Sequence, residues 1–336
     1  MKVLVTGATG FIGGNLAREL WGRGHDVRTL VRPDSNILTI EDTGIERVPG
    51  DILDRASVDR AVAGCEAVFH CAAAYTFWSE DPQMVRRTNV DGTVNVIDSA
   101  VAGGVSRVVY TSTVSTIGLP KHGLGDEATS VDPQGLYGHY KQSKYQAEQQ
   151  TLKMVEGGSP VVIVNPTAPI GPWDVKPTPT GKMVLDFMRR RIPAYLATGL
   201  NVVDVADVVE GHILALERGK TGERYILGNQ NMTLKELFIK LSEATGLPGP
   251  RLRLPYWLVV GAGYVDRAVS SGLLHREPTI PLEGILASKK PALVSCDKAV
   301  KELGLPQSPV DSALKRAVQW FAEHDYVSDY VKLETA

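Results

Sequence analysis

The sequence predicts an α/β fold in which a doubly wound parallel sheet is joined to a smaller mixed α/β region. Two features lead to this prediction. Short apolar segments of strand character alternate with segments of helical character through the first 165 residues. At the N-terminus, the strand-like segment 3–6 runs through a glycine-rich turn into a helical segment, an order that is typical of parallel sheets with a ligand site at this turn.

The glycine-rich turn carries Gly7, Gly10 and Gly13 at intervals of three residues. A strand that turns through glycines into a helix directs backbone N–H groups and the positive end of the helix dipole at one point, which suits a pyrophosphate. A side chain at these positions would hold a dinucleotide away or disturb the packing of helix against strand. The G-x-x-G-x-x-G spacing differs from the usual G-x-G-x-x-G fingerprint, and glycines alone can form a purely structural turn. The strand before them and the helix after them favour a Rossmann-type nucleotide site.

The remaining elements of the first part follow from their hydrophobic patterns. Strands are predicted at 25–31, 45–48, 67–71, 107–111 and 160–164, and helices at 15–23, 54–63, 83–102 and 137–155. Asp54 is suited to cap the second helix. The continuous apolar run 67–71 is typical of a strand that is buried on both faces. We therefore assign residues 1–165 to a Rossmann-type NAD(P)-binding domain with helices on both faces of its sheet.

The composition of the chain changes at its second part. Five prolines interrupt regular structure between residues 166 and 179. Helices are predicted at 204–218 and 311–324, and a strand at 223–227. Thr233 and Glu236 form a capping box, which predicts a helix that ends near Gly246. We assign residues 166–336 mainly to a substrate-binding region, and we expect some of its segments to return to the first domain.

Composition limits the possible functions. The chain has 336 residues, of which 43% are hydrophobic and 22% charged, as in ordinary globular proteins of about two domains. A net charge of −2 argues against nucleic acid as a partner. Three cysteines without a paired framework, and an N-terminus that leads directly from Met1 and Lys2 into the first strand, predict a cytoplasmic location. The apolar segment 257–265 is too short for stable insertion into a membrane. The seven histidines lack ligand spacing, so no metal site is expected.

Two residues of the predicted helix 137–155 suggest acid–base chemistry. Tyr140 and Lys144 are four residues apart, so they share one face with Cβ atoms about 5–6 Å apart. Tyrosine, with a pKa of about 10, is a poor base near neutrality, but an adjacent ammonium group lowers that pKa. The pair could therefore exchange a proton with a carbonyl–alcohol couple, assisted by a hydroxyl from segment 111–115. A Y-x-x-x-K spacing alone usually marks an exposed helix face, but the glycine turn upstream favours a site.

Seven motifs follow one another in the order of a known family. They are Thr6–Gly13, Gly50–Ile52, His70–Ala73, Thr88–Thr93, Thr111–Thr113, Tyr140–Lys144 and Asn165–Pro166. In combination they resemble the extended short-chain dehydrogenase/reductase family, of NAD-dependent epimerase/dehydratase type, over nearly the whole chain. Within that family the sequence is most similar to hopanoid-associated sugar epimerases, on segments 171–181 and 224–228, and next to dihydroflavonol-4-reductases.

The resemblance implies a role for each motif. Tyr140 would exchange the proton, and Lys144 would hold the nicotinamide ribose and tune Tyr140. The third catalytic hydroxyl, usually a serine, falls on Thr113, although Ser112 or Ser115 could be the donor instead. Asn89 would support the site. The full set of implied cofactor-binding residues, apart from Arg32, is Gly7, Gly10, Phe11, Ile12, Gly13, Asp51, Ile52, Cys71, Ala72, Ala73, Asn89, Tyr140, Lys144 and Pro166. The residues expected to face the substrate are Tyr75, Thr113 and Asn165.

The predicted second strand is followed by Arg32. Proteins that bind NAD typically have an acidic residue here, which takes the ribose 2′-hydroxyl. A guanidinium group instead matches a 2′-phosphate in charge and geometry. An exposed arginine at a strand end is the simpler alternative. We expect Arg32 to bind the cofactor and favour NADP, with NAD as the second possibility.

These features predict an NADP-dependent oxidoreductase that transfers a hydride between nicotinamide and a secondary alcohol or ketone. The resemblance favours a sugar epimerase, whereas Arg32 favours an exchanging NADPH and a net reductase, so both remain open. The alternatives are a nucleotide-sugar epimerase or dehydratase that retains NAD, and a non-catalytic nucleotide-sensing module. The substrate would be a small molecule bearing a sugar, polyol or ketone group, and a lipid-linked one would fit hopanoid biosynthesis. A homodimer is the family expectation.

Two segments fall outside this account. Arg189–Arg191 could bind the diphosphate of a nucleotide sugar, although such charge runs usually form a solvated helix end. Tyr256–Tyr264 could approach a lipid substrate or a membrane surface, although a helix packed on the second region is the simpler interpretation.

Overall fold

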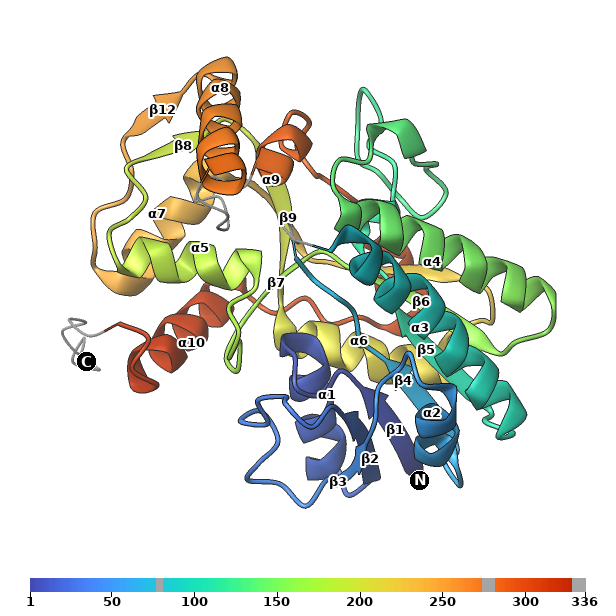
Figure 1. The fold of residues 1–336 in the computed structure, drawn as a ribbon. Coiled ribbons are helices and arrows are strands. Elements are labelled where there is room, and N and C mark those ends of the chain that lie inside the picture. The colour runs from blue at the N-terminus through green and yellow to red at the C-terminus, as the bar shows by residue number, and fades with distance from the viewer. Residues whose placement is uncertain (77–80, 274–281, 328–336) are drawn as a thin grey trace.

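A seven-stranded parallel sheet forms the centre of the first region (Figure 1). The computed structural model describes residues 1–76, 81–273 and 282–327. The strands, in the order in which they neighbour one another, are β10 (Arg224–Leu227), β6 (Val161–Pro166), β5 (Arg107–Thr111), β4 (Ala67–His70), β1 (Lys2–Thr6), β2 (Asp26–Val31) and β3 (Glu46–Pro49). The strand order reverses between β1 and β4, and ligands of such sheets bind at this switch point. The predicted doubly wound α/β fold is confirmed.

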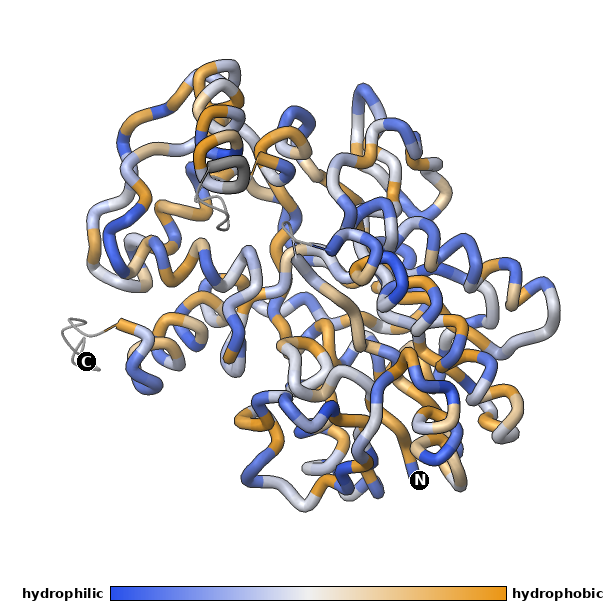
Figure 2. The backbone as a smooth tube through the Cα atoms, in the orientation of Figure 1, coloured by the Kyte–Doolittle hydropathy of each residue, from blue (hydrophilic) through white to orange (hydrophobic). Residues whose placement is uncertain are grey.

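Helices cover both faces of this sheet. One face carries α1 (Phe11–Gly22) and α6 (Val205–Arg218), and the other carries α2 (Arg55–Val62), α3 (Pro82–Ala102) and α4 (His139–Glu156). Fully buried aliphatic side chains alternate between the two faces along the strands, and hydrophobic residues follow the central strands in Figure 2. The sheet therefore has a separate apolar core on each side.

The first helix begins earlier than its apolar pattern predicts. Helix α1 starts at Phe11, whereas helical character in the sequence begins at residue 15. Its first turn contains Gly13 and Gly14, which are poor helix formers but are both buried here. A Cβ on Gly13 would lie 2.3 Å from the carbonyl oxygen of Gly7. Close packing of the helix start against the turn therefore explains why glycine stands in a helix.

The second region is built on two small sheets. In the first sheet, β9 (Gly199–Asp204) lies between β7 (Ala168–Ile170) and β11 (Gln230–Thr233), and in the second β8 (Ala194–Leu196) pairs with β12 (Leu252–Leu254). A separate apolar core gathers α5 (Pro179–Met188), α7 (Leu234–Thr245) and α10 (Val310–Glu323). Strand β10 pairs with β6, so the chain returns to the large sheet after residue 166.

Several short elements of this region escaped prediction. The strands β7, β8, β11 and β12 have three or four residues each, too few for a visible alternation. Helix α5 was missed because its prolines suggest irregular structure. Pro179 occupies the first turn, where the missing N–H costs nothing, and the Thr178 hydroxyl accepts a bond from the backbone N–H of Gly181 at 3.3 Å. Proline breaks the interior of a helix, but in the first turn of α5 it is compatible with helix formation.

The segment 256–264 forms most of α8 (Tyr256–Arg267), which packs against α9 (Leu282–Ala287). The helix itself was predicted, but Gly263 is its only buried residue. The simpler interpretation, a helix packed into the second region, therefore holds only for the side of α8 that carries Gly263. Among the described residues, no helix combines the length and the apolar composition that crossing a bilayer requires.

Candidate active site

The glycine turn places the N-terminus of α1 at the carboxyl ends of β1 and β4. Gly7 has a φ of +76°, and a Cβ there would lie 2.6 Å from the backbone nitrogen of Ala72. Gly10 precedes the helix without a side-chain cap and is exposed. The first N–H groups of α1, which include those of Phe11 and Ile12, have no partner within the helix. The turn is therefore shaped to receive a phosphate group.

The contact between Gly13 and Gly7 supports a first prediction. Gly13→Ala should greatly weaken nucleotide binding and lower the unfolding temperature, because the new methyl group would meet the Gly7 carbonyl at 2.3 Å. Overpacking of this kind typically costs about 1–3 kcal/mol. Gly22→Ala is the matched control, since a Cβ at the end of the same helix meets nothing within 4 Å. Fluorescence titration with NADPH and thermal melts would measure both effects. Unchanged binding by Gly13→Ala would contradict the role given to this turn.

The residues expected to meet the adenosine side lie at the ends of β2 and β3. Leu30 pairs with Thr6, so Arg32 lies at the same edge of the sheet as the glycine turn, and it is exposed. Asp51 accepts the backbone N–H of Leu53 at 2.9 Å, which shapes the turn after β3. Ile52 is buried instead: a Cβ on Gly92 of α3 would lie 2.6 Å from its Cδ1.

A buried histidine joins β1, β4 and α3 beneath the glycine turn. Burial lowers the pKa of His70 to about 3, so its ring is neutral. The Thr93 hydroxyl donates to the carbonyl of Asn89 at 2.6 Å, and it therefore accepts from His70 Nε2 at 3.0 Å. His70 Nδ1 is then the acceptor for the Thr6 hydroxyl at 2.8 Å. This directional chain of bonds fixes the strand ends that hold the turn.

The segment after β4 runs along the floor of the site. Cys71 and Ala72 are half-buried and Ala73 is exposed. Burial raises the pKa of Cys71 to about 11, so it remains a thiol and accepts the Thr111 hydroxyl at 3.2 Å. These residues follow the strand that neighbours β1, which puts them beside the glycine turn.

Asn89 is 1% exposed and supports the site from α3. Its Oδ1 accepts the backbone N–H of Ala74 at 2.7 Å, and its Nδ2 donates to the Ser143 hydroxyl at 2.9 Å. The residue after Ser143 is Lys144. Asn89 therefore connects the segment after β4 to the helix that carries the predicted catalytic pair.

Tyr140 lies in a buried environment beside two predicted partners. Burial raises its pKa to about 12, and a hydrogen bond with the side chain of Thr113 acts in the opposite direction. The ring of Tyr75 lies 4.6 Å from that of Tyr140, measured between centroids, and Tyr75 is 46% exposed. Ser112, by contrast, donates its hydroxyl to Glu148 at 2.5 Å, away from the tyrosine. Of the candidate hydroxyls, that of Thr113 is thus the one bonded to Tyr140.

Lys144 is 2% exposed, and two hydrogen bonds to residues of β5 hold its ammonium group. Its Nζ donates to the hydroxyl of Tyr110 at 3.0 Å and to the carbonyl of Thr111 at 2.7 Å. Burial lowers the pKa of Lys144 to about 8. The sequence predicts that Lys144 lowers the pKa of Tyr140, but burial dominates and raises it in the protein alone. Tyr140 and Lys144 do lie one turn apart on α4, but the ammonium group of Lys144 is hydrogen-bonded to residues of β5.

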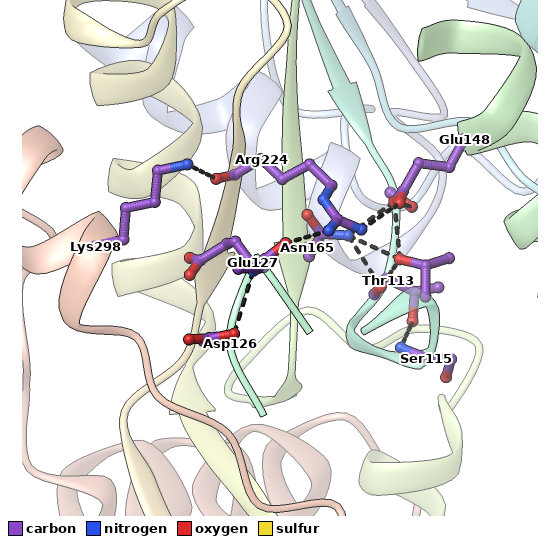
Figure 3. A network of polar contacts seen from close by, with 11 residues as sticks. Thr113, Ser115, Asp126, Glu127, Glu148, Asn165, Arg224 and Lys298 are labelled. Atoms are coloured by element: carbon purple, nitrogen blue, oxygen red, sulfur yellow. Dashed lines mark hydrogen bonds and ion pairs between the residues drawn. The ribbon is translucent and has the colours of Figure 1, made fainter. Parts of the chain in front are cut away.

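The fully buried Glu148 is the centre of a polar network (Figure 3). Its Oε2 accepts from the Ser112 hydroxyl at 2.5 Å, the Thr116 hydroxyl at 2.8 Å and Asn165 Nδ2 at 2.9 Å. Its Oε1 accepts from Arg224 Nη1 at 3.1 Å. One carboxylate therefore holds together the end of β5, helix α4, strand β6 and strand β10.

The network continues beyond Arg224 (Figure 3). The other terminal nitrogen of this guanidinium donates to the backbone carbonyl of Glu127. The carboxylate of Glu127 accepts the backbone N–H of Ile226 at 2.8 Å, and Lys298 Nζ donates to the carbonyl of Arg224 at 2.9 Å. The returning strand β10 is thus attached to the loop before α4 and to the C-terminal part of the chain.

Asn165 lies in this network and not on an open wall of the site. It is fully buried, and its Nδ2 donates to the carbonyl of Thr113 at 3.1 Å as well as to Thr116 and Glu148. The family resemblance implies that Asn165 faces the substrate, but its amide nitrogen holds the strand end that carries Thr113. Pro166 ends β6 at the same edge of the sheet and is buried.

Asp174 brings a buried carboxylate from the second region toward Tyr75. It is 1% exposed and accepts both the backbone N–H and the hydroxyl of Thr178. Burial raises the pKa of Asp174 to about 6. Desolvation around the Tyr75 hydroxyl raises its pKa, although the residue as a whole is 46% exposed, and Tyr140 and the charge of Asp174 raise the pKa further.

Sequence reasoning missed three residues of the site: Tyr110, Glu148 and Asp174. A signal existed for Glu148, which follows Lys144 by four residues and therefore shares the face of α4 that carries Tyr140. A carboxylate on a buried helix face requires partners. Tyr110 was predicted only as part of a strand, since its contact with Lys144 depends on the packing of α4 against β5.

Comparison with known proteins shows which proteins this chain is similar to. The family model of the NAD dependent epimerase/dehydratase family matches residues 3–228. A protein of Synechocystis sp. named as a candidate dihydroflavonol 4-reductase is 45% identical over 328 residues, covering 96% of this chain and 95% of that protein. The sterol demethylase protein B of Methylococcus capsulatus is 33% identical, covering 97% and 100%. The crystal structure of gox2253 has a TM-score of 0.86 at 42% identity, covering 97% and 99%.

Proposed function

We propose that this chain, which belongs to the NAD dependent epimerase/dehydratase family, is an NADPH-dependent reductase of ketones. Independently of this proposal, the chain is an enzyme, an NAD(P)-dependent oxidoreductase of the extended short-chain dehydrogenase/reductase type. The observation that carries the proposal is the pairing of Tyr140 with Thr113 at the end of β5, beside an open glycine turn and Arg32.

The proposed chemistry distributes its steps among three side chains. When bound, the cofactor supplies the hydride. Tyr140 donates its phenolic proton to the substrate oxygen, because its raised pKa keeps it protonated near neutral pH. Thr113 hydrogen-bonds the same oxygen. Lys144 has two of its three N–H groups engaged by Tyr110 and Thr111, which leaves one for the ribose hydroxyls.

The other site residues bind the cofactor or the substrate, or position the catalytic groups. In this proposal Gly7, Gly10, Phe11, Ile12 and Gly13 hold the pyrophosphate; Asp51 and Ile52 meet the adenine; Cys71, Ala72, Ala73 and Pro166 flank the dinucleotide. Asn89 positions Ser143 and the catalytic helix. Tyr75 contacts the substrate next to Tyr140. Asn165 positions Thr113 through its amide nitrogen, and its contact with the substrate stays a prediction of the resemblance.

Arg32 supports NADP as the exchanging cofactor. Its guanidinium is exposed at the end of β2, and within the described part of the chain it forms no hydrogen bond or ion pair. A free guanidinium at this position can bind a 2′-phosphate through two parallel bonds. An exchanging NADPH fits net reduction better than epimerisation, in which the cofactor stays bound and is regenerated in each turnover.

The cofactor preference can be tested directly. Arg32→Ala should weaken NADPH binding about 10- to 100-fold, the effect of one or two charge-assisted hydrogen bonds, and leave NADH binding unchanged. Arg60→Ala is the matched control, because Arg60 is also exposed but lies in the last turn of α2. Fluorescence titration with both cofactors measures the effect. An equal loss for NADPH and NADH, or no loss, would contradict the assignment of Arg32.

The remaining assignments belong to the same proposal. The substrate is a small molecule that carries a ketone, sugar or polyol group. A lipid-linked substrate, as in hopanoid biosynthesis, is supported by the sterol in the name of one relative. The proposal also includes a homodimer and a cytoplasmic location.

A further inference from the structure

The largest group of exposed apolar side chains in the described part of the chain lies on β12, on α8 and on the short helical segment Ala268–Leu273 that follows α8. Six of the fifteen exposed large hydrophobic residues fall between residues 252 and 269. Their exposed fractions are 59% for Leu252, 72% for Trp257, 43% for Leu258, 55% for Tyr264, 65% for Val265 and 40% for Val269. A patch of this kind on a protein surface usually marks a contact with another apolar surface.

These side chains share the outward face of α8. At 3.6 residues per turn, Trp257, Leu258, Tyr264 and Val265 fall within an arc of roughly 120°. No charged side chain of the described helix falls in this arc, and the buried Gly263 lies on the other side. A surface helix of a globular protein normally turns its polar face outward. In α8 an apolar arc is exposed instead, so this face is suited to an apolar environment. Figure 2 shows hydrophobic residues along this helix.

Arginines border this face. Arg251 and Arg253 flank Leu252 on β12 and are exposed. Parallel pairing of β12 with β8 brings the segment of Arg190 alongside, and Arg190 and Arg251 line one cavity of about 250 Å³. Across the residues that the structure describes, none of these three guanidinium groups forms a hydrogen bond or ion pair. The face is therefore basic, although the whole chain has a net charge of −2.

We propose that α8 and β12 form a surface that docks onto a lipid bilayer with anionic headgroups. Trp257 and Tyr264 have the amphipathic rings that settle at the level of the headgroups. The apolar face of α8 enters the boundary of the acyl chains, and Arg251 and Arg253 bind the headgroup phosphates. The charge complementarity distinguishes this occupant from an apolar protein face, which would leave the arginines unpaired. The inference goes beyond the proposed reductase activity and does not depend on it.

The test is sedimentation of the full chain with vesicles of phosphatidylcholine, alone and mixed with phosphatidylglycerol. We expect binding to the mixed vesicles, little binding to phosphatidylcholine alone, and release at high salt. Trp257→Glu should weaken binding at least about tenfold, since it removes a large apolar side chain that the bilayer would bury. Arg251→Glu and Arg253→Glu should each weaken it about fivefold or more. The control is Ile239→Glu, which alters another exposed apolar residue, on α7, and should leave binding unchanged.

Each other outcome overturns the proposal. Absence of binding to the mixed vesicles by the unaltered chain would do so without any variant. Equal binding to both vesicle types would remove the role of the arginines. If Trp257→Glu instead converts a dimer to a monomer in light scattering, the face is covered by a second copy of the chain. An NADPH titration of each variant checks that the fold is intact, so a failure of docking is distinguishable from a failure of the proposed function.

Discussion

Tyr140→Phe is expected to lower turnover of an accepted ketone by about 10²- to 10⁴-fold, the contribution of a positioned general acid. The phenyl ring keeps the contact with Tyr75 at 4.6 Å between centroids but has no proton to donate. Binding of NADPH should change little, because the substitution leaves the glycine turn and Lys144 in place. Steady-state kinetics with a ketone found by a carbonyl screen, together with a cofactor titration, would separate the two effects.

Tyr145→Phe is the matched control for this prediction. Tyr145 lies on the same helix but is only half-buried. Loss of its hydroxyl should leave turnover within about twofold, since this hydroxyl forms no hydrogen bond within the described part of the chain. Full turnover by Tyr140→Phe would show that the proton comes from another group, and a parallel loss in both variants would point to damage of α4.

Glu148→Ala should destabilise the protein more than Gly13→Ala or any of the surface substitutions. The Glu148 side chain is fully buried, with Ser112, Thr116, Asn165 and Arg224 as its hydrogen-bond donors. Removing one partner of a buried ion pair typically costs about 3–5 kcal/mol. Arg224, whose side chain is 21% exposed, would keep its bond to the Glu127 carbonyl but lose its counter-charge. Thermal and urea unfolding would measure it. Turnover should fall as well, since Asn165 would no longer be held beneath Thr113.

Two further variants serve as controls for the effect of Glu148→Ala on stability. Glu148→Gln keeps an oxygen acceptor but loses the charge, so its loss of stability should be smaller than that of Glu148→Ala. Gln146→Ala removes an exposed polar side chain from the same helix and should change stability by less than about 0.5 kcal/mol. If Glu148→Ala unfolds at the same temperature as Gln146→Ala, the network of Figure 3 does not stabilise the site.

Local sequence was sufficient for the parts of the fold that repeat a simple pattern. The strands β1, β4, β5 and β6 are largely apolar runs, so their positions were predicted to within a few residues. The capping box at Thr233 and Glu236 has both of its hydrogen bonds. These features depend on residues that are close in the chain, which makes them visible without a structure.

Features that depend on contacts between distant segments were not predictable in this way. The partners of Lys144 come from β5, 33 and 34 residues away, and the amide of Asn165 bonds to residues 17, 49 and 52 positions away. The sequence could propose a tyrosine–lysine pair but not the direction of its bonds. Likewise, an apolar run such as 257–265 indicates a helix, but only the packing of α8 reveals that this face is exposed.

The nucleotide that the purified chain carries and exchanges tests the central claim most directly. After release and identification of any bound nucleotide, the chain would be titrated with NADPH and NADH. The account predicts that little nucleotide is retained, that NADPH binds reversibly, and that NADH binds about 10- to 100-fold more weakly, as expected from charge-assisted bonds of Arg32. Tightly retained NAD would contradict it, and would identify the protein as an epimerase or dehydratase that regenerates its own cofactor.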